Sequence, residues 1–187
     1  MSRLPPLDPA TLDAGQKVVY DRIASGARGG VGGPFTVLLQ SSELASRVEQ
    51  LGVFIRYDCD VPQRLRELAI LVVGAHWKAE YEWYAHAGIA RGQGLSPEVI
   101  AAIGTGREPS FDADADRVVF RFVHELLSTG RVSDAAYAPL RDLLGDKAAV
   151  ELTGLVGYYT LLALQLNTFQ VKPPEGGPPI PWASPAP

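Results

Sequence analysis

Residues 64–86 read RLRELAILVVGAHWKAEYEWYAH, and this stretch decides the fold of the 187-residue chain. Its first half follows Asp60 and Pro62, which are typical helix-start residues. The apolar side chains that come next cover nearly every side of the predicted helix: Leu65, Leu68, Ala69, Leu71, Val72 and Val73. Because a helix that is apolar over so wide an arc avoids water only when it is surrounded, this segment is predicted to be a central, buried helix.

Helix signals also flank this stretch on both sides. The pattern is a capping residue followed by apolar side chains three and four residues apart. It predicts further helices from Asp8-Pro9 to about Ser25, from Ser41-Ser42-Glu43, from Ser96-Pro97-Glu98, from 112–116 to Gly130, from Ser133 to Gly145, and from Asp146 to about Asn167. No stretch alternates apolar and polar residues for the length of a strand. The fold class is therefore predicted to be all-α, with residues 1–171 forming one compact multi-helix bundle.

The last sixteen residues, Lys172 to Pro187, differ in composition from the rest of the chain. They carry seven prolines and two glycines. Since proline removes a backbone donor and blocks a helix interior, this segment is predicted to be an extended C-terminal arm. Ile180 and Trp182 leave two interpretations open: an arm that packs on something, such as a neighbouring subunit, and a loose tail.

Composition excludes several classes of function. The net charge is −4, without the basic patch that nucleic-acid binding requires. The longest apolar run, Leu68 to Ala75, is too short to cross a bilayer, and the N-terminus lacks the apolar core of a signal peptide. Cys59 is the only cysteine, so no intrachain disulfide can form. We expect a cytoplasmic protein with neither a nucleic-acid nor a membrane partner.

The second half of the opening stretch carries a candidate acid/base pair. Glu82 and His86 are four residues apart, so a helix places them on one face. A carboxylate beside an imidazole fixes its tautomer and favours its protonated form, which suits general acid/base chemistry. Trp83 and Tyr84 flank the pair and would shield it from water. The alternative interpretation is an ordinary solvated ion pair on a helix surface.

Glu67 is the third candidate, because a carboxylate among apolar neighbours is costly unless it is paired. Fifteen residues separate it from Glu82, which would be roughly 22 Å along one straight helix. The two carboxylates can share a site only if the chain reverses between them, and Gly74 to Lys78 is the predicted place. The alternative is that Glu67 pairs with Arg64 or Arg66 in a structural role.

These residues resemble the motif of a known family. In the alkylhydroperoxidase-like helical family, a Glu is followed after twelve residues by a Cys-x-x-Cys pair and then by a His. The matching positions in this chain are Glu67, Ala79, Glu82 and His86. Both cysteines are thus replaced, and Cys59 lies outside the motif between two aspartates. Because the dithiol route needs a reactive thiolate and a resolving partner, peroxidase activity of that kind is not expected.

The variant found here is similar to the carboxymuconolactone decarboxylase branch of that family. The similarity rests on Arg-x-Arg-Glu-Leu at 64–68, Glu-Tyr-Glu-Trp at 80–83, the helix start at 94–98, and Asn167-Thr168-Phe169 before the Pro-rich arm. It implies a cofactor-independent lyase acting on a small carboxylated or lactone substrate. It also implies a homo-oligomer, either a trimer or a hexamer.

For such a lyase, His86 would donate a proton to the carbanion left by decarboxylation, with Glu82 as its orienting partner. Glu67 would be a second acid/base or a polar anchor, and Arg64 or Arg66 would hold a substrate carboxylate. Trp83 and Tyr84 complete the predicted substrate-binding set. Two alternatives stay open: a non-catalytic oligomeric protein that binds small molecules, and an isomerase or hydratase using the same pocket.

Other sites are less favoured by the sequence. The three histidines at 76, 86 and 124 lack the spacing of a metal-binding motif, so neither a metal site nor a cofactor is predicted. The Gly-rich stretch from Gly26 to Pro34 lacks a phosphate-loop ending and is interpreted as a connector. Tyr158 and Tyr159 are assigned to core packing.

Overall fold

The computed structural model of the chain is all-helical, which confirms the predicted fold class. It describes residues 2–5, 7–26, 29–176 and 179–182. The elements in order are η1 (Pro9–Thr11), α1 (Ala14–Ser25), α2 (Phe35–Leu38), α3 (Ser42–Val53), the π-helical turn η2 (Phe54–Asp58), α4 (Gln63–His76), α5 (Glu80–Gly92), α6 (Pro97–Gly104), α7 (Asp114–Thr129) and α8 (Asp134–Phe169). The part of the chain described here contains no strand.

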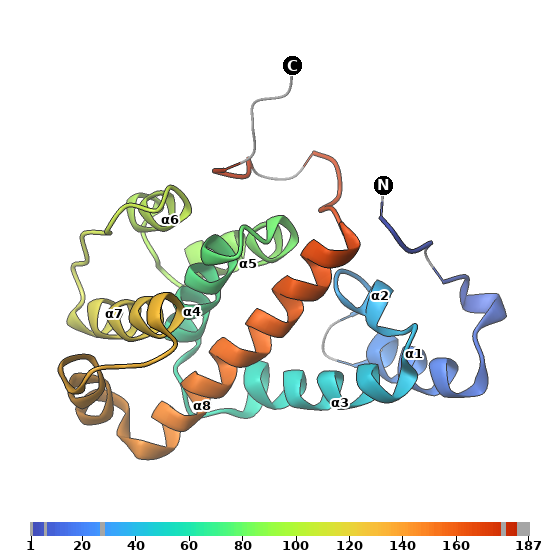
Figure 1. Cartoon of the computed structure of the whole chain (residues 1–187), viewed down its shortest axis with the longest axis horizontal. Coiled ribbons are helices and arrows are strands. Elements are labelled where there is room, and N and C mark those ends of the chain that lie inside the picture. Colours follow the sequence, from blue (N-terminus) through green and yellow to red (C-terminus); the bar gives the residue numbers. More distant parts are fainter. Residues whose placement is uncertain (1, 6, 27–28, 177–178, 183–187) are drawn as a thin grey trace.

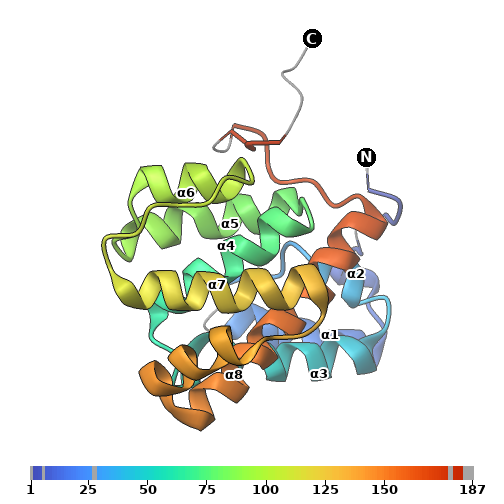
Figure 2. The same cartoon turned by 60° about the vertical axis from the view of Figure 1, so that its left-hand side comes forward.

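Helix α4 lies at the centre of the bundle, as its apolar coverage predicts. It packs against α5, α6, α7 and α8, and Leu68, Ala69 and Leu71 have no exposed surface. Helix α8 runs diagonally past α4, with α5 to α7 on one side and α1 to α3 on the other (Figure 1 and Figure 2). The core is therefore organised around the α4–α8 contact.

The chain reverses between α4 and α5, as Glu67 and Glu82 require if they are to meet. Helix α4 ends at His76, and Lys78 adopts a left-handed conformation with φ of 50°. The backbone N–H of Ala79 then donates to the carbonyl of Gly74 at 2.9 Å, which closes the turn before α5 begins. The two helices lie side by side as a hairpin.

The predicted start of the first helix is wrong. Asp8 and Pro9 begin only the short 3-10 turn η1, after which Leu12 is extended. The longer helix α1 begins at Ala14, because Asp13 and Gln16 form a reciprocal capping box. Val18 of α1 is 65% exposed.

Helix α8 joins two predicted helices across a kink. Gly145 has φ of 78° and ψ of 169°, so the helix direction changes at the residue where the sequence predicts a break. By length and composition, α8 is a helix that could span a membrane, yet 56% of its most apolar window is buried inside this fold. That burial is typical of a core helix.

The described part of the C-terminal arm packs on this chain itself. Ile180 and Trp182 lie against the hydrophobic core. The ring of Trp182 meets the ring of Trp83 edge-on, with 5.1 Å between the ring centroids. Of the two interpretations of these side chains, the structure therefore favours an arm that packs.

Candidate active site

His86 lies between two carboxylates that come from different helices. Its Nδ1 is 2.7 Å from Oε2 of Glu67 on α4, and its Nε2 is 3.5 Å from Oε2 of Glu82 on α5. The three residues are buried, with 5% or less of each exposed. The α4–α5 hairpin thus brings together the three residues that the sequence singles out for chemistry, and Glu67 does reach the pair.

The closer contact fixes how the imidazole is oriented. An ionised carboxylate only accepts hydrogen bonds, so Nδ1–H donates to Glu67. Nε2 is then the ring atom available for proton exchange, and it faces Glu82. The closer, orienting contact therefore comes from Glu67, whereas Glu82 is the orienting partner predicted from the sequence.

A cavity of about 230 Å³ opens beside this group. Its walls come from the segment before α2, from η2, from α5 and from α8, through Gly30, Gly32, Pro34, Phe35, Arg56, Tyr81, Glu82, Ala85, His86, Tyr159 and Leu162. Glu67 is not among these residues, because it lies behind the imidazole. A ligand in this cavity would meet His86 and Glu82 directly, while Glu67 would act on it only through His86.

Arg56 and Tyr159 add a cation and a hydroxyl donor to the same cavity. Burial opposes the charged guanidinium of Arg56, but the acidic groups of Tyr159, Tyr57 and Glu67 outweigh it, so the pKa of Arg56 is raised. Burial raises the pKa of Tyr159 well above its usual value, although Arg56 partly opposes the shift. Arg56 thus stays charged and Tyr159 keeps its proton.

The Tyr159 hydroxyl is buried and lacks a hydrogen-bond partner among the described residues. Its ring meets the His86 ring edge-on, with 5.2 Å between the centroids. A buried hydroxyl without a partner costs about 1–3 kcal/mol, so such groups are rare outside functional sites. A ligand with an acceptor oxygen in the cavity would give this donor its missing bond.

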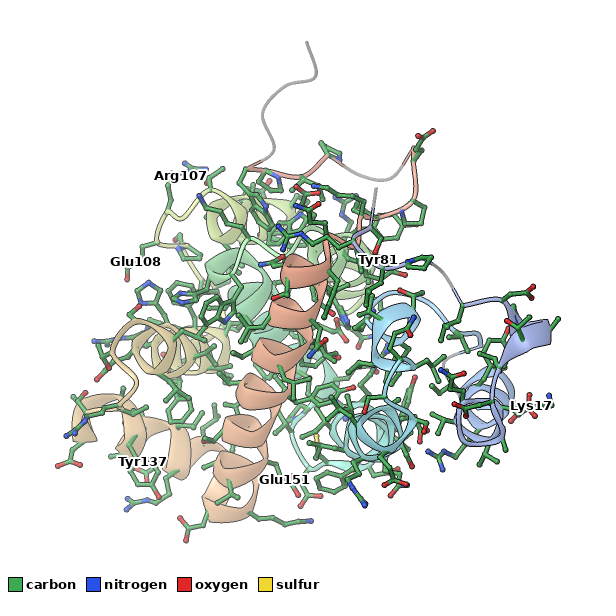
Figure 3. All side chains as sticks on the ribbon, turned by 45° about the vertical axis from the view of Figure 1, so that its right-hand side comes forward. Lys17, Tyr81, Arg107, Glu108, Tyr137 and Glu151 are labelled. Atoms are coloured by element: carbon green, nitrogen blue, oxygen red, sulfur yellow. The ribbon has the colours of Figure 1, made fainter. Side chains whose placement is uncertain are left out.

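Tyr81 and the Gly-rich segment close one side of the cavity. Gly33 has φ of 56°, and a Cβ added to it would lie 2.5 Å from Cε1 of Tyr81. Burial, followed by the nearby Glu82 carboxylate, raises the pKa of Tyr81. In Figure 3 the labelled Tyr81 lies between α8 and the α2 segment. The segment interpreted as a connector is therefore also a wall of the site.

The structure places the four predicted substrate-binding residues outside this cavity. Arg64 donates to both oxygens of the buried Asp116, at 3.2 and 2.5 Å, and to the carbonyl of Gln93. Arg66 donates to the sulfur of Cys59 at 3.5 Å. The Trp83 ring packs against Trp182, and the Tyr84 ring lies 6.0 Å from that of Tyr81. Other partners thus hold these four side chains outside the cavity, and their role in substrate binding stays a prediction.

The cavity contains two chemically useful groups that the sequence does not reveal. Arg56 belongs to no motif, and it reaches the site only because the π-helical turn follows α3. Tyr159 is assigned to core packing from its apolar neighbours, which is true of its ring but leaves out its hydroxyl. The only feature of the sequence that could have indicated Tyr159 is the presence of two consecutive tyrosines, Tyr158 and Tyr159, on the inward side of the last helix.

The fold and site together define an all-helical protein with a buried Glu–His–Glu group on an α-hairpin. Residues 42–125 match the model of the carboxymuconolactone decarboxylase family, and this match includes Glu67, Glu82 and His86. Over these residues the chain is similar to that family, as its motif indicates. No curated protein sequence matches the chain.

Several solved structures share the fold over most of its length. A peroxidase-related protein with an alkylhydroperoxidase core from Ralstonia eutropha JMP134 is 18% identical, with a TM-score of 0.77 and 93% of each chain covered. An Agrobacterium tumefaciens protein described as a possible antioxidant defence protein is 19% identical, with a TM-score of 0.66, over 76% of this chain and 99% of the other. The debrominase Bmp8, in a cysteine-to-alanine variant with 2,3,4-tribromopyrrole, is 15% identical, with a TM-score of 0.71, over 94% of this chain and 95% of the other. At these identities, the similarity establishes the fold alone.

Proposed function

We propose that this chain is a cofactor-independent carboxy-lyase that acts on a small carboxylated or lactone substrate by acid/base chemistry. The observation that carries the proposal is the imidazole of His86, held between Glu67 and Glu82 at the wall of a small cavity. The family match supports the class of enzyme.

Arg56 is the substrate anchor in this proposal. It is a cation that lines the cavity, and its guanidinium suits the two oxygens of a carboxylate. It takes the role predicted from the sequence for Arg64 or Arg66, whose guanidinium groups are bound to other partners.

Decarboxylation needs stabilisation of negative charge and then a proton. When the bond to the carboxylate breaks, its electron pair stays on the substrate as an enolate and CO₂ leaves. The Tyr159 hydroxyl is placed to donate a hydrogen bond to the enolate oxygen, since it retains its proton and has no described protein partner. His86, as an imidazolium with a proton on each ring nitrogen, then delivers the Nε2 proton to carbon and becomes neutral. Glu67 keeps the ring oriented and Glu82 stabilises the imidazolium, while a proton from solvent water restores Nε2–H after the product leaves.

The thiol chemistry suggested by the peroxidase-related neighbours lacks its residues in this chain. Ala79 and Glu82 occupy the two positions of the dithiol motif. Cys59 is buried, and its S–H donates to the carbonyl of Ile55 rather than facing the cavity. These substitutions favour acid/base chemistry over peroxide reduction.

A ligand screen followed by an assay tests the proposal. Small lactones, keto acids and aromatic acids are screened for thermal stabilisation, and each hit is assayed for CO₂ release. We expect His86→Ala and Glu82→Gln to lower turnover by at least 100-fold, within the range that general acid/base groups contribute. His124→Ala, a histidine outside the cavity, is the control and should keep full turnover. Unchanged turnover in the first two variants would overturn the proposal.

The second candidate function is a non-catalytic protein that binds small molecules. The replacement of both thiols by Ala79 and Glu82 favours it, because a binder would retain the cavity after losing the dithiol chemistry. Thermal stabilisation by many compounds without turnover of any would support this candidate. Turnover to an isomer or a hydrated product, with no CO₂, would instead indicate another acid/base reaction in the same cavity.

A further inference from the structure

A second and larger cavity of about 920 Å³ lies between α4, α6, α7 and the C-terminal arm. Its volume is within the range of pockets that bind small organic molecules. It shares no lining residue with the first cavity, and α5, which gives four residues to the first, gives none to this one. Figure 3 shows Arg107 and Glu108 of its rim across α8 from Tyr81 of the first cavity. The two cavities are therefore separate.

One part of the second cavity is an apolar wall. Val72, Ile103, Phe120 and Leu127 contribute to it from the three helices, and Trp182 contributes from the arm. Phe120 is 8% exposed and stacks with the His124 ring at 5.5 Å between centroids. The indole N–H of Trp182 is buried and has no hydrogen-bond partner among the described residues. A ligand lying on this wall would meet aromatic faces and one unused donor.

The other part is a rim that carries mostly positive charge. It includes the three cations Lys78, Arg107 and Arg121, together with the imidazoles of His76 and His124. None of these five has an ion-pair partner within 4 Å in the described parts of the chain. Burial, and then the neighbouring His124, lowers the pKa of His76. A cationic rim is unusual in a chain of net charge −4.

The two acidic residues of the rim offset only two of its three cations. Glu125 accepts hydrogen bonds from the backbone N–H of Ser133 at 2.7 Å and from its hydroxyl at 3.2 Å. Its carboxylate is therefore held beside the residue that caps α8. Glu108 remains as the other acid. The rim therefore attracts a negative charge, while the wall favours an apolar body.

We propose that this cavity binds a small apolar anion, such as an aromatic or aliphatic carboxylate or sulfonate. The anionic head would lie at the rim beside Lys78 and Arg121, and the apolar body would lie against Phe120 and Trp182. The described arm thus forms one wall of a ligand site. This inference is independent of the reaction at His86.

The test uses two fluorescent probes of similar apolar shape on the full-length chain. 1-Anilinonaphthalene-8-sulfonate carries a negative charge, and N-phenyl-1-naphthylamine does not. We expect saturable binding of the sulfonate at micromolar concentration. The double variant Lys78→Gln with Arg121→Gln should weaken sulfonate binding about tenfold and change binding of the neutral probe less than threefold. Trp182→Ala should weaken the binding of both probes. An unchanged midpoint of thermal unfolding in this variant confirms that the bundle stays folded.

Matched controls assign the binding to this cavity. Arg141→Gln removes an exposed cation on α8, and Arg56→Gln removes the cation of the first cavity. Both should bind the sulfonate as the unaltered chain does. The proposal is overturned if neither the double variant nor Trp182→Ala weakens binding of the sulfonate, or if Arg56→Gln abolishes that binding. It is also overturned if light scattering shows that the rim variants change the oligomeric state, since the cavity would then be a contact between copies.

Discussion

At the scale of single residues, the contact between Glu67 and His86 links stability to chemistry. Both groups are almost fully buried, so each relies on the other for its hydrogen bond at 2.7 Å. Removing one member of such a pair leaves the other buried without a partner. The Glu67 side chain is therefore expected to matter for folding as well as for the orientation of the imidazole.

Glu67→Ala is expected to lower the free energy of unfolding by about 3 kcal/mol, because it strands the imidazole of His86. Glu67→Gln should cost about 1–2 kcal/mol, since the amide oxygen still accepts a hydrogen bond but without the charge. Urea unfolding monitored by tryptophan fluorescence measures both. An exposed acid on a helix, Glu43→Gln, serves as the control and should change little. Equal losses in the two Glu67 variants would contradict the assigned hydrogen bond.

Tyr159 predicts a particular response to alkaline pH. Burial raises its pKa in the folded state, so above the ordinary tyrosine pKa of about 10 the unfolded chain loses a proton that the folded chain retains. The stability that this group contributes is present below pH 10 and is lost as the pH rises further. Tyr159→Phe should therefore show a shallower loss of stability from pH 9 to pH 11 in urea unfolding.

The control for this measurement is Tyr137→Phe, because Tyr137 is 39% exposed. It should follow the pH dependence of the unaltered chain. At pH 7, Tyr159→Phe should be as stable as the unaltered chain or up to about 1 kcal/mol more stable, because it removes a buried hydroxyl without a described partner. If the stability of Tyr159→Phe declined with pH as that of the unaltered chain does, the effect of burial on the pKa of Tyr159 would be contradicted.

The sequence predicts the buried group better than it predicts the cavity. Glu67, Glu82 and His86 lie on two consecutive helices, so spacing and the need for a reversal bring them together. Arg56 and Tyr159 come from η2 and α8, which only the tertiary packing brings to α5. Arg64 was assigned to substrate although it pairs with Asp116, 52 residues later, a contact that no local pattern indicates.

At the scale of elements, the sequence predicts both breaks in the chain and most helix starts, and the first helix is the exception. Gly145 and the segment from Gly74 to Lys78 interrupt strong helical patterns, and the structure bends at both places. The start of α1 is missed because Asp8 and Asp13 are both good caps, and only Asp13 has Gln16 in place to complete a capping box. When two capping residues as similar as Asp8 and Asp13 lie close together, the packing of the resulting helix decides which of them begins it.

The kink of α8 predicts that alanine has opposite effects on stability at two glycines of this helix, Gly145 and Gly157. Gly145 has a conformation that is almost restricted to glycine, yet a Cβ there would meet no atom within 4 Å. Gly145→Ala should therefore lower stability by about 1–3 kcal/mol through backbone strain alone. Gly157→Ala, also in open space but in regular helix, should raise stability by about 0.5–1 kcal/mol. Chemical denaturation measures both, and effects of the same sign would contradict the strain at Gly145.

At the scale of the whole molecule, a line of exposed apolar side chains runs along α3 and η2. Leu44, Leu51, Phe54 and Tyr57 are each 40–48% exposed. Helix α3 runs along the lower right of the molecule in Figure 1. Exposed apolar groups gathered on one element are typical of a contact surface. The homo-oligomer implied by the family resemblance, a trimer or hexamer, remains a prediction, and this surface is where we expect a contact.

Leu51→Arg is expected to reduce the oligomeric mass measured by size-exclusion chromatography with light scattering, because it places a charge in the predicted contact. Leu164→Arg, at a residue 45% exposed on α8, is the control and should leave the mass unchanged. A monomeric unaltered chain, or an oligomer that tolerates Leu51→Arg, would contradict this placement of the contact.

The edge-on contact of Trp83 with Trp182 gives the protein a natural optical reporter. The chain has three tryptophans, and these two rings lie close enough for their electronic transitions to couple. Such coupling produces a paired signal of opposite signs in circular dichroism, which is lost when the rings separate. The state of the C-terminal arm can therefore be followed spectroscopically during purification, storage or ligand titration, without attaching a label.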